Sequence, residues 1–176
     1  MKTLIAGFDG DTNSAKILLD NIKDTNSIDI LYLKNSFEIS QKQIEDKMLQ
    51  NYDYILIFGQ KSKTKNIYLE NNAILGNTEL ITDYYYGVLK SFLEKADYKV
   101  FSSSNAGNYL CNNVFFRALD FKQKNKLNTK IAFIHIPTIN NIEDITKISK
   151  VLLDYIKTLS DIFNIALLQL SPTDTM

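Results

Sequence analysis

The 176-residue sequence contains one cysteine, Cys111, and one histidine, His135. A single cysteine cannot form a disulfide within the chain, and such scarcity fits a reducing compartment, so we expect a cytoplasmic protein. A metal cluster built from cysteines is excluded, and a lone histidine leaves little for a zinc site. We therefore expect a protein that holds no metal.

An excess of charge of either sign is also missing, because 20 basic residues balance 20 acidic ones. No segment is basic enough to suggest binding to nucleic acid or to an anionic membrane. Apolar runs such as residues 54–58 and 165–170 are far too short to cross a bilayer, and the N-terminal apolar stretch lacks a cleavage site. No glycine-rich nucleotide-binding motif occurs, so we expect no nucleotide cofactor.

Apolar runs of strand length alternate with segments of helical periodicity along the whole chain. We expect strands at 3–8, 28–33, 53–59, 98–103 and 130–137, and helices at 13–23, 36–50, 82–96, 106–121 and 141–163. A further strand-like piece lies in the polar segment 61–78, and the tail 171–176 is expected to be frayed. This alternation predicts an α/β fold, a three-layer α/β/α sandwich around a mostly parallel sheet, in a single domain spanning residues 1–176.

Local signals support several of these boundaries. Asn13 or Ser14 is a suitable N-cap for the first helix, and Thr82 is expected to open the helix at 82–96. The near-continuous apolar run at 53–59 is typical of a strand that is covered on both faces.

Ligands of such sheets bind outside the carboxyl ends of the strands. Gly7-Phe8, Gly59-Gln60, the turn before Cys111 and His135 are all expected at this end of the sheet. The sequence therefore places its only thiol and its only imidazole near one another.

Cys111 follows a cluster of Ser, Asn and Gly residues. If Ser104 or Asn105 caps the following helix, Cys111 lies in its second turn, where the positive end of the helix dipole favours a thiolate. Gly107 would permit close approach of a ligand to the backbone. The alternative is that Cys111 is a small buried apolar residue that serves only packing.

His135 at the end of a buried strand is suited to acid–base chemistry, although a histidine there can also be a hydrogen-bonded residue at the edge of the core. A cysteine and a histidine together form a nucleophile–base couple. A carboxylate best orients the imidazole, and Glu70 is the first candidate, with Glu79 and Asp83 as competitors.

These segments resemble the pyroglutamyl peptidase I family, also called pyrrolidone carboxyl peptidases. The resemblance rests on "SSSNAGNYLCNNVFFRAL", "AFIHIP", "FGQ…NIYLENNAI" and "AGFDG", which follow the family's order. It implies a cysteine omega-peptidase that releases N-terminal pyroglutamate from peptides through a thioester, without a cofactor. By position it implies that Cys111 is the nucleophile, His135 the general base and then acid, and Glu70 its orienting partner. Phe8 and Gln60 match substrate-binding positions.

The sequence departs from the family pattern around the substrate. The loop after Phe8 is short and lacks a second Phe, "KSKT" at 61–64 lacks the family's Gly-Gly-Arg, and Asn71 replaces an Arg. One alternative is therefore a degenerate, non-catalytic homologue that binds ligands, and another is an interaction module in which Cys111 is structural. Homo-oligomerisation is left open.

Overall fold

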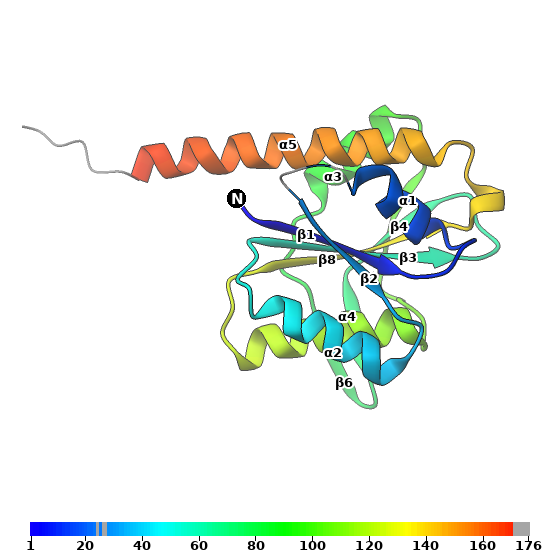
Figure 1. Ribbon diagram of the computed structural model, residues 1–176, viewed down its shortest axis with the longest axis horizontal. Coiled ribbons are helices and arrows are strands. Elements are labelled where there is room, and N and C mark those ends of the chain that lie inside the picture. The colour runs from blue at the N-terminus through cyan, green and yellow to red at the C-terminus, as the bar shows by residue number, and fades with distance from the viewer. Residues whose placement is uncertain (24, 26–27, 171–176) are drawn as a thin grey trace, which may run out of the picture.

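The computed structural model describes residues 1–23, 25 and 28–170, so the tail predicted to be frayed lies outside the described residues (Figure 1). Its main sheet has the strand order β2-β1-β3-β8-β4-β7. The strands are β1 (Thr3–Phe8), β2 (Ile28–Leu33), β3 (Tyr54–Lys61), β4 (Ile67–Glu70), β7 (Val100–Ser103) and β8 (Lys130–Pro137). Strand β4 runs antiparallel to β8, and the other neighbours pair in parallel, so the predicted mostly parallel sheet is confirmed.

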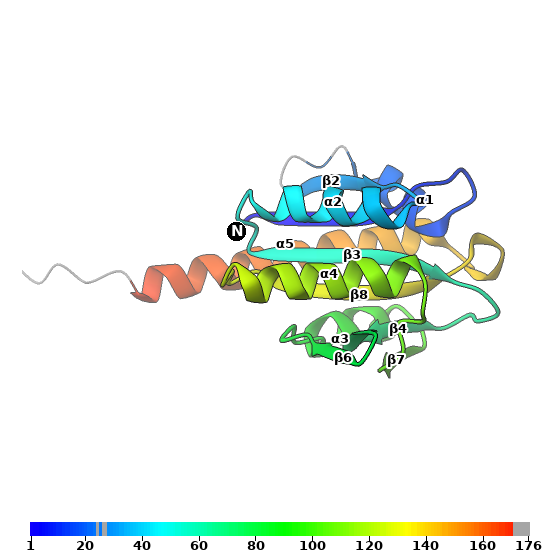
Figure 2. The same ribbon diagram turned by 90° about the horizontal axis from the view of Figure 1, so that it is seen from below.

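Helices cover both faces of this sheet (Figures 1 and 2). One face carries α1 (Ser14–Ile22), α3 (Gly87–Lys95) and α5 (Ile145–Leu170), and the other carries α2 (Phe37–Met48) and α4 (Leu110–Lys124). A small antiparallel sheet of β5 (Asn72–Leu75) and β6 (Thr78–Ile81) packs beside α4, and the 3-10 helix η1 (Ile139–Asn141) precedes α5. The predicted three-layer α/β/α arrangement is therefore confirmed.

The central strand β3 shows why its sequence is almost continuously apolar. Leu56 and Phe58 pack in the cluster formed with α1 and α5, whereas Ile55 and Ile57 pack in the cluster formed with α2 and α4. Successive side chains of a strand point to opposite faces, so a strand with helices on both sides needs an apolar residue at each position. No described helix is both long and apolar enough to cross a membrane.

The prediction of a helix opened by Thr82 is wrong, because α3 begins at Gly87. The Thr82 hydroxyl donates instead to the carbonyl of Ile131, and the side chains of Tyr84 and Tyr86 are buried in the core. Burial of two large aromatic rings holds this segment out of the helix that its periodicity suggests.

The helix that carries Cys111 also begins later than predicted. Its N-cap is Tyr109, which forms no side-chain capping bond, and Leu110 is the first helical residue. The Asn105 side chain accepts a hydrogen bond from the amide of Gly107, which has a positive φ of 85°, so this segment forms a turn. Cys111 therefore lies in the first turn of α4, nearer its N-terminus than the sequence indicated.

Candidate active site

Strands β4 and β8 place Glu70 and His135 in contact. His135 follows Phe133 on the face of β8 that α4 covers, and the two rings pack edge to face. The imidazole Nδ1–H donates to the Glu70 carboxylate Oε1 at 2.7 Å. Glu70 is fully buried and His135 is 4% exposed. This bond fixes the ring orientation and leaves Nε2 free for chemistry.

Cys111 meets His135 above Gly59, which lies beside His135 in the sheet register. A methyl group placed on Gly59 would lie 2.8 Å from Cys111 Sγ and 3.1 Å from His135 Cδ2, the ring carbon next to Nε2. Because the thiol and the imidazole both lie close to this single point, they are neighbours. The missing side chain of Gly59 is what allows this approach.

We expect Gly59→Ala to impair the site strongly. The added methyl group would also lie 3.0 Å from Phe133 Cζ, so the thiol, the phenyl ring or the imidazole must move. The expected cost is about 1–3 kcal/mol of stability from overpacking and at least about a tenfold loss of turnover from displacement of the reacting atoms. Urea unfolding and steady-state kinetics measure the two effects.

The control is the same substitution in a Cys111→Ala background, where the nearest atom, Sγ, has been removed. Gly59→Ala should destabilise this background less than it destabilises the wild type. An equal cost in both backgrounds would contradict close packing of the sulfur on Gly59.

Electrostatics keep Glu70 ionised despite its burial. Burial raises the pKa of Glu70, but the hydrogen bond from His135, the hydroxyl of Ser103 and the positive charge of Lys61 outweigh it, and the net pKa lies below its ordinary value. The second carboxylate oxygen, Oε2, has no hydrogen-bond partner among the described residues. An ionised Glu70 can stabilise an imidazolium at His135.

The two competing carboxylates lie in other interactions. Glu79 accepts a hydrogen bond from the side chain of Asn72, and Asp83 pairs with Lys122 and Lys130. Glu70 is thus the candidate that contacts the imidazole.

The backbone around Glu70 is fixed from the opposite face of the sheet. The Tyr86 hydroxyl donates to the Glu70 carbonyl at 2.9 Å and accepts from the Phe133 amide at 3.0 Å. Glu70 and Phe133 are partners in the β4–β8 register. The buried tyrosine therefore braces both strands at the level of the carboxylate.

The expectation of a lowered thiol pKa is wrong. Burial raises the pKa of Cys111 to about 12, and the negative charge of Glu70 adds to this effect. The backbone amide of Cys111 and the charge of Lys61 act in the opposite direction but are weaker. The helix terminus is present, but desolvation outweighs it, so the resting side chain is a neutral thiol.

The alkylation rate of Cys111 should therefore keep rising with pH. Only the thiolate reacts with iodoacetamide, so a high pKa predicts no plateau up to the alkaline limit of stability. The second-order rate constant, measured by mass spectrometry across pH, checks this. A plateau reached by neutral pH would instead show a thiolate in the resting site.

The two residues expected to bind substrate lie at the same end of the sheet but face different ways. Phe8 is 3% exposed and packs in the cluster beneath α2 and α4, on the same side as Cys111. The Gln60 side chain accepts a hydrogen bond from the Ser14 amide at the start of α1, on the other side of the sheet. Gln60 can therefore face the thiol only through its backbone.

Sequence reasoning overlooked an aromatic pair and a cation. Phe37 and Tyr109, at the starts of α2 and α4, stack edge to face at 5.1 Å and are both exposed. Lys61 lies 3.6 Å from Glu70 Oε1 and 4.4 Å from the ring centre of Tyr68. Strand alternation was the available signal for Lys61, because residues 59 and 61 share a face.

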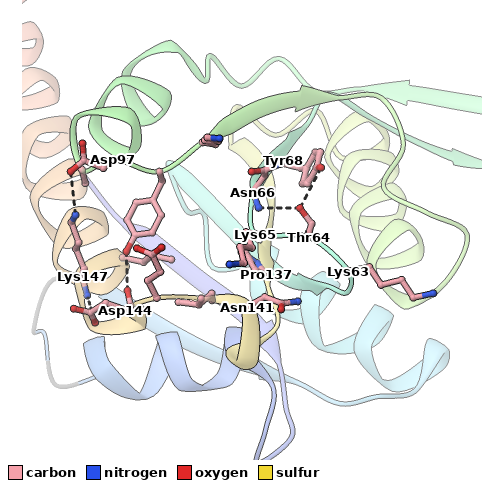
Figure 3. Close-up of a pocket in the computed structure, with 16 residues that line it drawn as sticks. Lys63, Thr64, Lys65, Asn66, Tyr68, Asp97, Pro137, Asn141, Asp144 and Lys147 are labelled. Atoms are coloured by element: carbon pink, nitrogen blue, oxygen red, sulfur yellow. Dashed lines mark hydrogen bonds and ion pairs between the residues drawn. The ribbon is translucent and has the colours of Figure 1, made fainter.

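A cavity of about 610 Å³ opens beside this end of the sheet (Figure 3). Tyr68 and Pro137 line it, together with lysines of the loop after β3. Figure 3 shows the Thr64 hydroxyl bonded to that of Tyr68. Cys111, His135 and Glu70 do not line this cavity, which is therefore separate from the three candidate catalytic side chains.

Comparison with known proteins decides the family. The model of a family described as pyroglutamyl peptidase matches residues 90–158, which include Cys111 and His135. A pyrrolidone-carboxylate peptidase 1 from Caldanaerobacter subterraneus subsp. tengcongensis is 30% identical over 167 residues, covering 78% of this chain and 82% of the relative. The chain belongs to the pyroglutamyl peptidase family. It is accordingly an enzyme of the cysteine peptidase type.

Solved structures of pyroglutamyl peptidases share the fold. A pyrrolidone carboxyl peptidase from Fervidobacterium islandicum AW-1 superimposes with a TM-score of 0.79 at 18% identity, covering 92% of this chain and 99% of that chain. The pyroglutamyl peptidase I from Bacillus amyloliquefaciens gives 0.74 at 21% identity, covering 86% and 90%. The resemblance suggested by the sequence motifs is therefore confirmed.

Proposed function

We propose that this enzyme removes N-terminal pyroglutamate from peptides through a Cys111–His135–Glu70 triad and a thioester intermediate. The observation that supports this most is the buried His135–Glu70 hydrogen bond beside a thiol that reaches the same point above Gly59. A nucleophile, a base and a group that orients the base are the parts that acyl transfer requires. The single cysteine further favours action in the cytoplasm.

In the acylation step, Cys111 Sγ attacks the carbonyl carbon of the pyroglutamyl residue while His135 Nε2 accepts the thiol proton. The raised pKa of Cys111 makes this concerted transfer preferable to a preformed thiolate. The tetrahedral intermediate then collapses, the C–N bond breaks, and His135 returns the proton to the leaving amine. Glu70 stabilises the transient imidazolium.

In the deacylation step, His135 accepts a proton from water as the hydroxide oxygen attacks the thioester carbonyl. The C–S bond then breaks, free pyroglutamate leaves, and the thiol is restored. Backbone amides in the first turn of α4 are suited to stabilise the oxyanion in both steps, since one of them already lies close to Sγ. A single such donor is typically worth about 3 kcal/mol.

The departures from the family pattern around the substrate should weaken binding of the pyroglutamyl ring. The lactam ring is small and neutral, so selectivity needs an apolar or aromatic wall and a few hydrogen bonds. The second Phe of the family loop is missing after Phe8, and one lost aromatic contact is worth about 1–2 kcal/mol. We expect a KM raised about tenfold relative to that of the Bacillus amyloliquefaciens enzyme, with kcat less affected.

Fluorophore release from a pyroglutamyl amide, compared with the matching prolyl amide, tests the function. The prolyl ring has the same size but lacks the lactam carbonyl, so we expect cleavage of the pyroglutamyl amide alone. Binding of pyroglutamyl amide without turnover by the folded protein would favour the non-catalytic alternative. A KM equal to that of the Bacillus amyloliquefaciens enzyme together with a much lower kcat would contradict the expected weakening of substrate binding.

A further inference from the structure

Lys61 is placed to act on the catalytic carboxylate. It occupies β3 two residues after Gly59, and its ammonium group lies 3.6 Å from Glu70 Oε1. The same oxygen accepts the hydrogen bond from His135 at 2.7 Å. One carboxylate oxygen is therefore shared by a permanent cation and by the imidazole that becomes cationic during catalysis.

The position of Lys61 is held by Tyr68. The ammonium group lies over the Tyr68 ring at 4.4 Å from its centre, and the Tyr68 hydroxyl accepts a hydrogen bond from Thr64. The Lys61 side chain is 34% exposed, whereas Glu70 is fully buried. A cation held against an aromatic face near a buried anion is screened less by water than a freely solvated lysine.

The other groups around this ion pair carry no permanent charge. They are the Tyr68 hydroxyl from β4, the Ser103 hydroxyl from β7, the thiol of Cys111 from α4 and the imidazole of His135 from β8, with the Tyr86 hydroxyl approaching from the segment just before α3. Among the residues that the structure describes here, Lys61 supplies the countercharge of Glu70 while His135 is neutral.

We propose that Lys61 is a positioning residue that partly neutralises Glu70 and so lowers the pH at which His135 becomes available as a base. If Lys61 is removed, the charge of Glu70 is balanced by the imidazolium alone, and His135 holds its proton more tightly. Lys61 also favours the thiolate of Cys111 electrostatically, which acts in the same direction.

The test uses the fact that the chain has one histidine, so its imidazole resonances in untagged protein report His135 alone. We expect Lys61→Met to move the midpoint of the NMR titration upward by about half to one pH unit. This size fits the loss of a partly screened charge that is separated from His135 by the Glu70 carboxylate. Lys61→Arg should restore the wild-type midpoint. Lys61→Gln provides a second neutral variant if Lys61→Met folds poorly.

Lys63→Met is the matched control, because Lys63 is exposed in the loop that follows β3 and forms no ion pair among the described residues. Its midpoint should equal that of the wild type. An unchanged midpoint in Lys61→Met and Lys61→Gln, or an equal shift in Lys63→Met, would overturn the proposal.

The importance of Lys61 for catalysis rests on the proposed function. A second measurement tests this importance separately from the titration of His135. The acid limb of kcat/KM for the pyroglutamyl amide should move upward in parallel with the NMR midpoint in Lys61→Met. A change in KM alone with an unmoved midpoint would mean that Lys61 contacts substrate, which would also overturn the proposal. If the wild type fails to cleave the amide, the NMR titration still decides whether Lys61 controls His135.

Discussion

Cys111→Ser is expected to lower kcat for a pyroglutamyl amide by about a thousandfold or more while the protein stays folded. A serine hydroxyl differs from the thiol by one atom, but at neutral pH it is a far weaker nucleophile without a dedicated arrangement for its activation. The residue keeps part of its surface exposed at the start of α4 although its thiol is desolvated, so this nearly isosteric substitution should change stability little. Initial rates and thermal unfolding measure the two quantities.

The control for this prediction is Asn125→Ser, a surface change at the other end of α4, which should leave turnover unchanged. Residual activity of Cys111→Ser above about a tenth of the wild-type rate would show that another group performs the attack. Such a result would remove the nucleophile from the proposed mechanism.

Glu70→Gln is expected to lower kcat by about a hundredfold or more, because the neutral amide cannot stabilise an imidazolium at His135. The amide is nearly isosteric and its oxygen can still accept the Nδ1–H hydrogen bond, so the geometry should survive. Lys61 then faces a neutral partner, and its charge opposes protonation of His135 further. The pH dependence of kcat measures the loss.

The same variant should show a changed dependence of stability on pH. The pKa of Glu70 in the folded protein lies below its ordinary value of 4.5, so its contribution to stability is present above that value and is lost as the pH falls through the folded pKa. Glu70→Gln should therefore flatten the acid side of the stability curve. Urea unfolding at several acidic pH values checks this.

Glu79→Gln and Asp83→Asn are the matched controls, since both acids pair away from His135. Neither should lower kcat by more than a few-fold. An unchanged kcat in Glu70→Gln together with a large loss of kcat in Asp83→Asn would show that the wrong carboxylate has been assigned as the partner of His135.

Much of the fold follows from sequence periodicity. The long buried strands β1, β3 and β8 and the helices α1 and α2 lie close to their predicted positions, because their apolar patterns match the burial that the sheet imposes. The strands β4 and β5 are covered only by the strand-like piece expected in the polar segment 61–78, and the sequence did not predict β6. The pairing of β4 depends on distant partners such as His135, which local patterns do not specify.

The starts of α3 and α4 were also hard to predict, because packing and not a capping side chain sets them. Tyr86 and Tyr109 are the N-caps of α3 and α4 without any capping side-chain bond, so the polar residues that usually mark a start were misleading. The segment before α3 is fixed instead by its buried tyrosines: Tyr86 bonds to β4 and β8, and the Tyr84 hydroxyl bonds to that of Tyr155 in α5.

The site was predictable in its chemistry but not in its electrostatics. A lone thiol, a lone histidine and a carboxylate in family-like motifs named the three residues that the fold brings together. The raised pKa of Cys111 could not be foreseen, because it results from burial under the surrounding side chains. Strand alternation could place Lys61 on the same face as Gly59, but not its contact with Glu70, which joins β3 to β4.

Partitioning of the acyl group between water and hydroxylamine tests the proposed mechanism most directly. A thioester on Cys111 would be common to all pyroglutamyl substrates, so a pyroglutamyl amide and a pyroglutamyl ester should give the same ratio of hydroxamate to free pyroglutamate at a fixed hydroxylamine concentration. Cys111→Ser should form neither product at a comparable rate. A ratio that differs between the two substrates, or enzymatic turnover that never yields hydroxamate, would contradict a covalent intermediate on Cys111.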